Sequence, residues 1–96
     1  MNTDDKVHVV FRIWNDGAGV LALFPGIAAT YEGNYCSSYQ HFGQHGSADY
    51  NHCISMTRPA TEEEYAELRG ELESLGYNLV VIRRTSQAIH AKRLAG

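Results

Sequence analysis

The sequence predicts one α+β domain, in which a small, mostly antiparallel sheet has one main helix packed on one face. Three observations support this class. Residues 7–14 alternate in the manner of a strand, Asp16-Gly17 marks a tight hairpin, and residues 61–75 combine a capping signal with an apolar stripe. The expected order is strand, strand, strand, helix, strand, with about four strands in the sheet. The 96 residues should form a single domain, with an ordered core over residues 6–84 and a tail over residues 85–96.

The first two strands are expected to pair as a hairpin. In residues 7–14 the odd-numbered side chains form an apolar face, whereas the even-numbered ones form a mixed face that should be half covered. Asp16-Gly17 supplies the positive φ angles of a tight turn. Residues 20–24 are apolar on both faces and should lie centrally in the sheet. Pro25-Gly26 should end this strand, because proline cannot donate to a ladder.

The middle of the chain is less regular. Residues 35–41 are expected to form a third strand. Gly43 and Gly46 interrupt the pattern that follows, so residues 42–47 are expected to be a loop. Residues 48–56 fit either a short helix or a further strand, and the periodicity does not choose between them.

Residues 61–75 form the clearest element, a helix. Thr61 and Glu64 are spaced as a capping box, in which each side chain satisfies a backbone N–H near the helix start. An apolar stripe that should face the sheet consists of Tyr65, Leu68, Leu72 and Leu75. Gly76 suits the position just past the helix, and residues 77–82 are expected to form the last strand.

Composition and charge narrow the classes of function. The formal net charge is −3, so general attraction to nucleic acid or to anionic membranes is not expected. No segment approaches the ~20 apolar residues of a membrane span, and the polar start of the chain does not match a secretory signal. We therefore expect a cytoplasmic protein without membrane attachment, in which Cys36 and Cys53 are reduced thiols.

The stretch from Tyr39 to Tyr50 is the expected functional surface. It contains two histidines, two glutamines, an aspartate and three aromatic residues within twelve positions. These side chains suit a protein interface, because they bury well and keep polar ends for hydrogen bonds. Some of the aromatic residues should also fill the core of so small a chain. The candidate binding residues are Tyr39, Gln40, His41, Gln44, His45, Asp49 and Tyr50.

Metal binding is an alternative for the same stretch. His41, His45 and Asp49 follow one another at intervals of four residues, which on a helix would align three ligands for zinc. Gly43 and Gly46 argue against a helix there, and hydrogen-bonded loop histidines would show the same spacing. We expect no cofactor. Zinc bound by these three side chains stays an alternative. Paired histidines could also act as acid and base in a hydrolase.

Direct binding of DNA or RNA is not expected. Phosphate contacts come mainly from Lys and Arg, and neither residue type occurs between Ile13 and Thr57. A protein partner fits the Tyr39–Tyr50 surface better. A homodimer formed through an edge strand is a further alternative for so small a sheet.

Several separated motifs resemble those of one protein family. They are Phe11-Arg12, Ala22-Leu23-Phe24-Pro25, the segment 36–50 with its Tyr-Gln-His-x-Gly-Gln-His run, Arg58-Pro59-Ala60-Thr61 with Glu63-Glu64-Tyr65, and Gly76-Tyr77. Over most of residues 7–84 the chain resembles a family of short uncharacterised proteins of bacteria, phages, plasmids and similar mobile elements. The resemblance implies a compact accessory protein of mobile DNA and assigns no catalytic role to any residue.

Together these inferences predict a small cytosolic accessory protein that binds a protein partner through the Tyr39–Tyr50 surface. The resemblance implies an anti-host or anti-defence role, in which the protein inhibits host machinery by binding it. The alternative is a small metal-dependent or His-based hydrolase that uses His41, His45 and Asp49.

Overall fold

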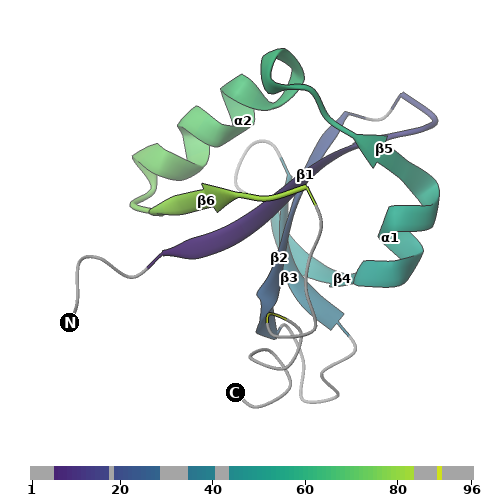
Figure 1. The fold of residues 1–96 in the computed structure, drawn as a ribbon, viewed down its shortest axis with the longest axis horizontal. Helices are drawn as coiled ribbons and strands as arrows, with labels where there is room; N and C mark the ends of the chain where they lie inside the picture. Colours follow the sequence, from purple (N-terminus) through teal and green to yellow (C-terminus); the bar gives the residue numbers. More distant parts are fainter. Residues whose placement is uncertain (1–5, 18, 29–34, 41–43, 84–88, 90–96) are drawn as a thin grey trace.

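The structure is a computed structural model that describes residues 6–17, 19–28, 35–40, 44–83 and 89. These residues form an α+β architecture with six strands and two helices (Figure 1). In chain order the elements are β1 (Val7–Trp14), β2 (Val20–Ala28), β3 (Tyr35–Gln40), β4 (Gln44–Asp49), α1 (Tyr50–Met56), β5 (Thr57–Pro59), α2 (Glu62–Ser74) and β6 (Leu79–Val81). The predicted fold class is confirmed, although the predicted order of elements omitted β4 and β5 and left the α1 segment undecided between helix and strand.

The sheet is centred on β1 and β2, and its strand order is β4-β3-β2-β1-β5. Neighbouring strands along this path run antiparallel. The short strand β6 instead runs parallel to β1 and pairs with Val7–Val9, whereas β5 pairs with Arg12–Trp14. Two different segments of the chain therefore cover the two ends of β1 (Figure 1).

Both faces of β1 are buried, because the two helices pack on opposite sides of the sheet. Val9 and Phe11 point toward α2, and Val10 points toward α1, which confirms the predicted alternation. The α2-side core consists of the buried residues Val9, Phe11, Ala22, Phe24, Tyr39, Leu68 and Leu72. The α1-side core consists of Val10, Leu21, Leu23, Cys36, Ala48, Tyr50 and Cys53.

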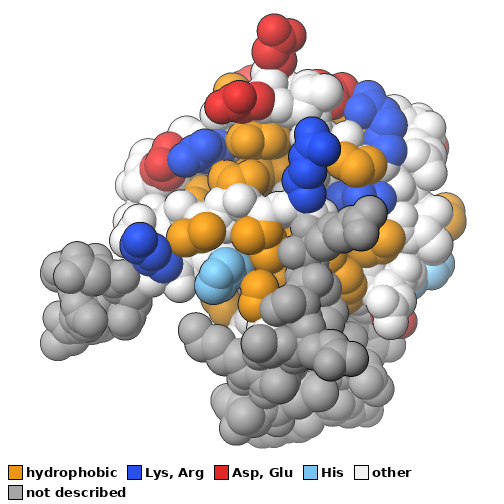
Figure 2. Space-filling view, viewed as in Figure 1, with side chains coloured by type: hydrophobic (Ala, Val, Ile, Leu, Met, Phe, Trp, Pro, Cys, Tyr) orange, Lys and Arg blue, Asp and Glu red, His pale blue; other side chains and the backbone are white. Residues whose placement is uncertain are grey.

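The helix α2 packs on the sheet through Leu68 and Leu72, which are buried. Tyr65 is half-buried, and its ring stacks on that of Phe11 with centroids 4.4 Å apart. The prediction that Leu75 belongs to the buried stripe is wrong, because this C-cap residue, one position beyond the helix, is 55% exposed. Hydrophobic side chains gather between α2 and β6 in the space-filling view, with acidic side chains at the α2 end of this face (Figure 2).

The start of α2 has the predicted capping box. Thr61 Oγ1 accepts a hydrogen bond from the N–H of Glu64 at 3.2 Å, and the Glu64 carboxylate accepts one from the N–H of Thr61 at 2.9 Å. Arg58 of β5 donates to both carboxylate oxygens of Glu64, at 3.0 and 2.7 Å. The bonds from Arg58, followed by that from the Thr61 N–H, lower the pKa of Glu64 to about 2.

The predicted end of β2 is wrong. The strand continues through Pro25 to Ala28 instead of ending at Pro25-Gly26. Its pairing with β3 shifts register between Phe24 and Ala28. An irregularity of this kind accommodates a residue that has no N–H to donate, so the proline interrupts the ladder without ending the strand.

The glycine-containing segment before α1 is more regular than predicted. Residues 44–47, expected in a loop, belong to β4, where Gly46 lies opposite Ser38 of β3. Pairing along the edge of the sheet thus outweighs the low strand propensity of glycine. The open choice for residues 48–56 is resolved into the end of β4 followed by α1. His41, expected at the end of the third strand, lies outside the described residues.

Replacing Leu72 with alanine tests the assigned buried face of α2. Leu72 is fully buried, so we expect Leu72→Ala to lower the free energy of unfolding by about 2–5 kcal/mol. The matched change Leu75→Ala removes the same atoms from an exposed site and should cost less than about 1 kcal/mol. Denaturant melts measure both values, and equal losses would contradict the packing of α2 described above.

The low pKa of Glu64 predicts a contribution to stability that acid removes. A carboxyl group whose pKa is lowered by folding stabilises the fold above its ordinary pKa of 4.5, and it loses this effect as the pH falls to about 2. Glu64→Gln keeps an acceptor for the Thr61 N–H but has no charge to lose. Urea melts should show the difference in unfolding free energy between wild type and variant shrinking from pH 4.5 to pH 2. A difference in unfolding free energy that does not change with pH would contradict a stabilising Arg58–Glu64 pair.

Candidate binding site

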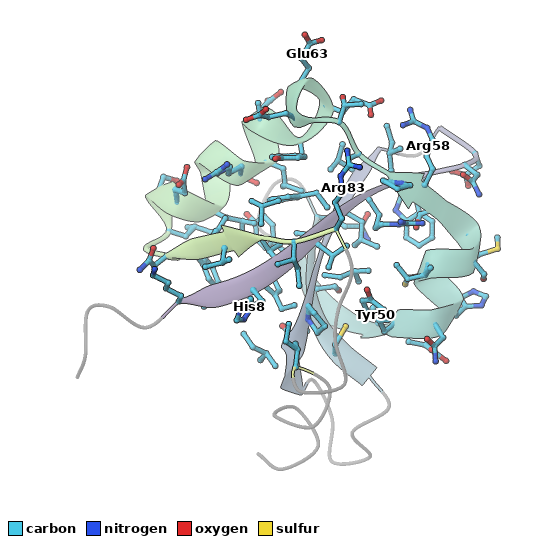
Figure 3. All side chains as sticks on the ribbon, viewed as in Figure 1. His8, Tyr50, Arg58, Glu63 and Arg83 are labelled. Carbon is cyan, nitrogen blue, oxygen red and sulfur yellow. The ribbon has the colours of Figure 1, made fainter. Side chains whose placement is uncertain are left out.

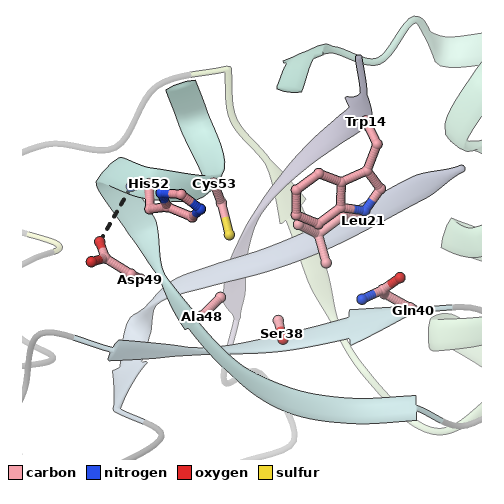
Figure 4. Close-up of a pocket in the computed structure, with 8 residues that line it drawn as sticks. All are labelled: Trp14, Leu21, Ser38, Gln40, Ala48, Asp49, His52 and Cys53. Carbon is pink, nitrogen blue, oxygen red and sulfur yellow. Dashed lines mark hydrogen bonds between the residues drawn. The ribbon is translucent and has the colours of Figure 1, made fainter. Parts of the chain in front are cut away.

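An open pocket of about 500 Å³ lies between α1 and the sheet, on the side of the α1-side core (Figure 4). Strands β1 to β4 and helix α1 all contribute side chains to it. The lining residues are Trp14, Leu21, Ser38, Gln40, Ala48, Asp49, His52 and Cys53. Trp14 and Gln40 lie at one end, and Asp49 and His52 lie at the other (Figure 4).

The floor of the pocket is formed by small residues of β3 and β4. Ser38 and Ala48 line it directly. Gly46 pairs with Ser38 across the two strands, and a Cβ added at Gly46 would lie 3.4 Å from Ser38 Oγ. Because Gly46 has no side chain, the Ser38 hydroxyl is left facing the open space. A larger residue at position 46 would fill part of the pocket.

The wall formed by α1 begins with an Asp49 cap. The Asp49 carboxylate accepts a hydrogen bond from the N–H of His52 at 3.3 Å, which fixes the first turn of the helix. The thiol of Cys53, one residue further on, points into the pocket (Figure 4). Asp49, His52 and Cys53 are therefore brought to the pocket by a single helical turn.

The Cys53 thiol is poorly suited to nucleophilic catalysis. Burial raises its pKa, and the nearby Asp49 carboxylate raises the pKa further. A thiol with a raised pKa stays protonated at neutral pH, whereas catalytic cysteines react as thiolates. Cys36 and Cys53 are both buried, and neither forms a disulfide.

The other end of α1 is fixed to the sheet by Arg12 of β1. This side chain is only 8% exposed. Its Nε donates to Thr57 Oγ1 at 2.9 Å, and its Nη2 donates to the carbonyls of Thr57 and Ile54 at 2.8 and 3.2 Å. Thr57 Oγ1 in turn donates to the carbonyl of Cys53 at 2.6 Å. Burial lowers the pKa of Arg12, but arginine keeps its charge, and the helix carboxyl end favours a cation.

The predicted surface residues divide into three groups in the structure. Gln40 and Asp49 line the pocket together. Tyr39 is 1% exposed and Tyr50 is 7% exposed, so both are core residues here, on opposite faces of the sheet. The Tyr50 side chain lies between α1 and the strands (Figure 3). His41 and the side chains of Gln44 and His45 lie outside the described part of the structure, although the backbones of Gln44 and His45 belong to β4.

Trp14, Ser38 and His52 line the pocket without having been predicted as site residues. Trp14 had a usable signal, because it is the single tryptophan of the chain and ends the mixed face of the first strand. For Ser38 and His52 no sequence signal indicated the pocket, because their positions depend on the pairing of β3 with β4 and on the placement of α1.

The metal hypothesis is not decided by this geometry. Among the described side chains, no group of three His, Cys, Asp or Glu residues is close enough to hold a metal ion. Of the three proposed ligands, His41 and the side chain of His45 lie outside the described residues, and Asp49 caps α1. Zinc binding by His41, His45 and Asp49 stays a prediction.

Thr57→Val tests the attachment of α1 to β1. The variant keeps the shape of the side chain but removes the acceptor for Arg12 Nε, so a buried charged donor loses a partner. We expect a loss of about 1–3 kcal/mol in unfolding free energy and faster reaction of Cys53 with a thiol reagent, because α1 is held less firmly. Ser55→Ala is the matched control, since it removes an exposed hydroxyl of α1 that bonds to His52 O. Equal effects of the two variants would refute the role assigned to Thr57.

Comparison of the chain with protein-family models, curated proteins and solved structures found no match. Within the part of the chain that the structure describes, neither helix is long and apolar enough to cross a membrane. The resemblance to mobile-element proteins therefore stays a prediction, and the pocket itself is the basis for assigning a function.

Proposed function

We propose that this protein is a small binding domain that engages a protein partner through the pocket between α1 and the sheet. The observation that supports this function is the placement of Trp14 and Gln40 beside a floor of small residues that leaves the pocket open. Gln40 and Asp49 belong to the Tyr39–Tyr50 stretch from which the sequence predicted binding. The structure adds Trp14 from a distant part of the chain to the same surface.

The chemistry of the lining suits recognition of a partner. Tryptophan is enriched among the residues that dominate binding energy at protein interfaces, especially where neighbouring groups exclude water. Trp14 is half-buried, so it is already held in place by Leu21 and the rest of the α1-side core but keeps an accessible surface. Gln40, Asp49 and His52 place polar groups around this apolar centre, an arrangement typical of interfaces.

The hydrolase alternative gains less support. Asp49, its proposed carboxylate, accepts the capping bond from His52 N–H, and this structural role accounts for its position. The raised pKa of Cys53 disfavours a cysteine nucleophile in the same pocket. The resemblance to mobile-element proteins directs the search for a partner to bacterial host proteins, including those of defence systems.

Filling the pocket should abolish binding without unfolding the domain. Gly46→Val places a side chain over Ser38, and valine is well suited to a strand. The matched control is Gly70→Ala, an exposed glycine of α2 with open space around it. A photoreactive amino acid at Gln40 reports contact at the pocket. The same group at Glu63, which projects from α2 (Figure 3), reports contact elsewhere.

In lysate from a bacterial host, the Gln40 probe should cross-link a defined protein at equimolar ratio, and the Glu63 probe should not. Gly46→Val should remove this cross-link while Gly70→Ala leaves it intact, with both variants showing wild-type circular dichroism. Cross-linking that is unchanged by Gly46→Val, or equally strong from Glu63, would refute a partner site at the pocket.

A further inference from the structure

The pocket has an unbalanced charge. Among the lining residues that the structure describes, none is Lys or Arg, and Asp49 is the acidic one. The effect of this carboxylate extends into the pocket wall, because it contributes to the raised pKa of the Cys53 thiol. Arg12, which lies on the same face of β1 as Trp14, is held at the carboxyl end of α1 by Thr57 and Ile54. A cation entering the pocket would therefore meet a carboxylate and no competing cation among the described lining residues.

The floor of the pocket carries the hydroxyl of Ser38. The residue is only 5% exposed, and it lines the pocket directly. The absence of a side chain at Gly46 keeps this oxygen accessible from the pocket. This oxygen can therefore act as an acceptor for a ligand that donates a hydrogen bond from within the pocket. Gln40 offers a second acceptor, its amide oxygen, beside Trp14 (Figure 4).

The flat indole of Trp14 selects among cations. A guanidinium group is planar, stacks on aromatic rings and presents its N–H groups at its edge, so it can lie against an indole while donating to acceptors in its own plane. An ammonium group is more strongly hydrated and lacks this fork. The apolar surfaces of Leu21 and Ala48 suit the methylene groups of such a side chain.

We propose that the pocket binds an arginine side chain of the protein partner, with the guanidinium against Trp14 and hydrogen-bonded to Ser38 Oγ and Gln40 Oε1, and with Asp49 supplying the complementary charge. This inference rests on the proposed function and names the chemistry that the site recognises. An anionic ligand is disfavoured by the Asp49 carboxylate, and none of the described lining residues is a cation that would attract it. A neutral aromatic ligand would make no use of the Asp49 carboxylate or of the Ser38 acceptor.

Three capped pentapeptides test this assignment on the full-length protein: one has a central arginine, one has citrulline in its place, and one has lysine. Citrulline keeps the planar shape of arginine but lacks the charge. Because Trp14 is the single tryptophan, its fluorescence and the NMR signal of its indole N–H report directly on the pocket. The arginine peptide should cause a saturable change, at about tenfold lower concentration than the citrulline peptide. The lysine peptide should lie between them.

Substitutions of the pocket residues Asp49 and Gln40 provide a second test. Asp49→Asn removes the charge but keeps a good helix cap, and it should weaken binding of the arginine peptide about threefold. Gln40→Glu adds a carboxylate beside Trp14 and should tighten binding. Glu63→Gln changes net charge by the same amount as Asp49→Asn on an exposed part of α2 and should have no effect.

The outcomes separate this inference from the function on which it rests. Equal binding of arginine and citrulline peptides, or no response of Trp14 to either, would overturn the assignment of arginine. The proposed function would still stand if Gly46→Val removed the partner cross-link. If Gly46→Val left that cross-link unchanged but blocked the arginine peptide, the pocket would recognise arginine without being the partner site.

Discussion

The position of α1 depends on a buried guanidinium. Arg12 belongs to the central strand β1, yet it donates to carbonyls at the carboxyl end of α1, where helix geometry leaves such groups unsatisfied. A helix of seven residues is too short to be stable alone, so it needs tertiary contacts of this kind. Asp49 stabilises the opposite end, and the two charges have the signs that the helix dipole favours. These two attachments, with the packing of Tyr50 and Cys53 in the α1-side core, position α1 over the sheet.

The pocket results from a difference in side-chain size across the α1-side face. Near Arg12 the space under α1 is filled by the large residues of the α1-side core, including Tyr50. Toward the edge of the sheet the floor changes to Ser38, Gly46 and Ala48, while α1 keeps the same attachment. The helix therefore spans a region that small residues do not fill. Trp14 covers one end of that region and leaves the rest open (Figure 4).

Features encoded by neighbouring residues could be predicted from the sequence. The capping box of Thr61 and Glu64 and the alternation along β1 depend on local spacing, and both are present. Features encoded by pairing could not. Gly46 resembles a loop residue until β3 lies beside it, and only then does β4 form. Tyr39 and Tyr50 suit an interface by composition, but strand alternation and the placement of α1 turn both into the core. Of the pocket residues, Gln40 and Asp49 were predicted from the sequence, whereas the contributions of Ser38 and His52 depend on pairing and helix placement and were not.

The pairing of β6 with β1 has a consequence for the order in which the domain can form. Residues 7–9 leave the ribosome before residues 79–81, which form the strand that completes their edge. The hairpin of β1 and β2 can assemble early, because its contacts are close in sequence. The first half of β1 must wait until residues 79–81 have been synthesised, and long-range parallel pairing of this kind slows folding. Until then that edge presents unpaired backbone groups, which makes the nascent domain dependent on the rapid synthesis and pairing of β6.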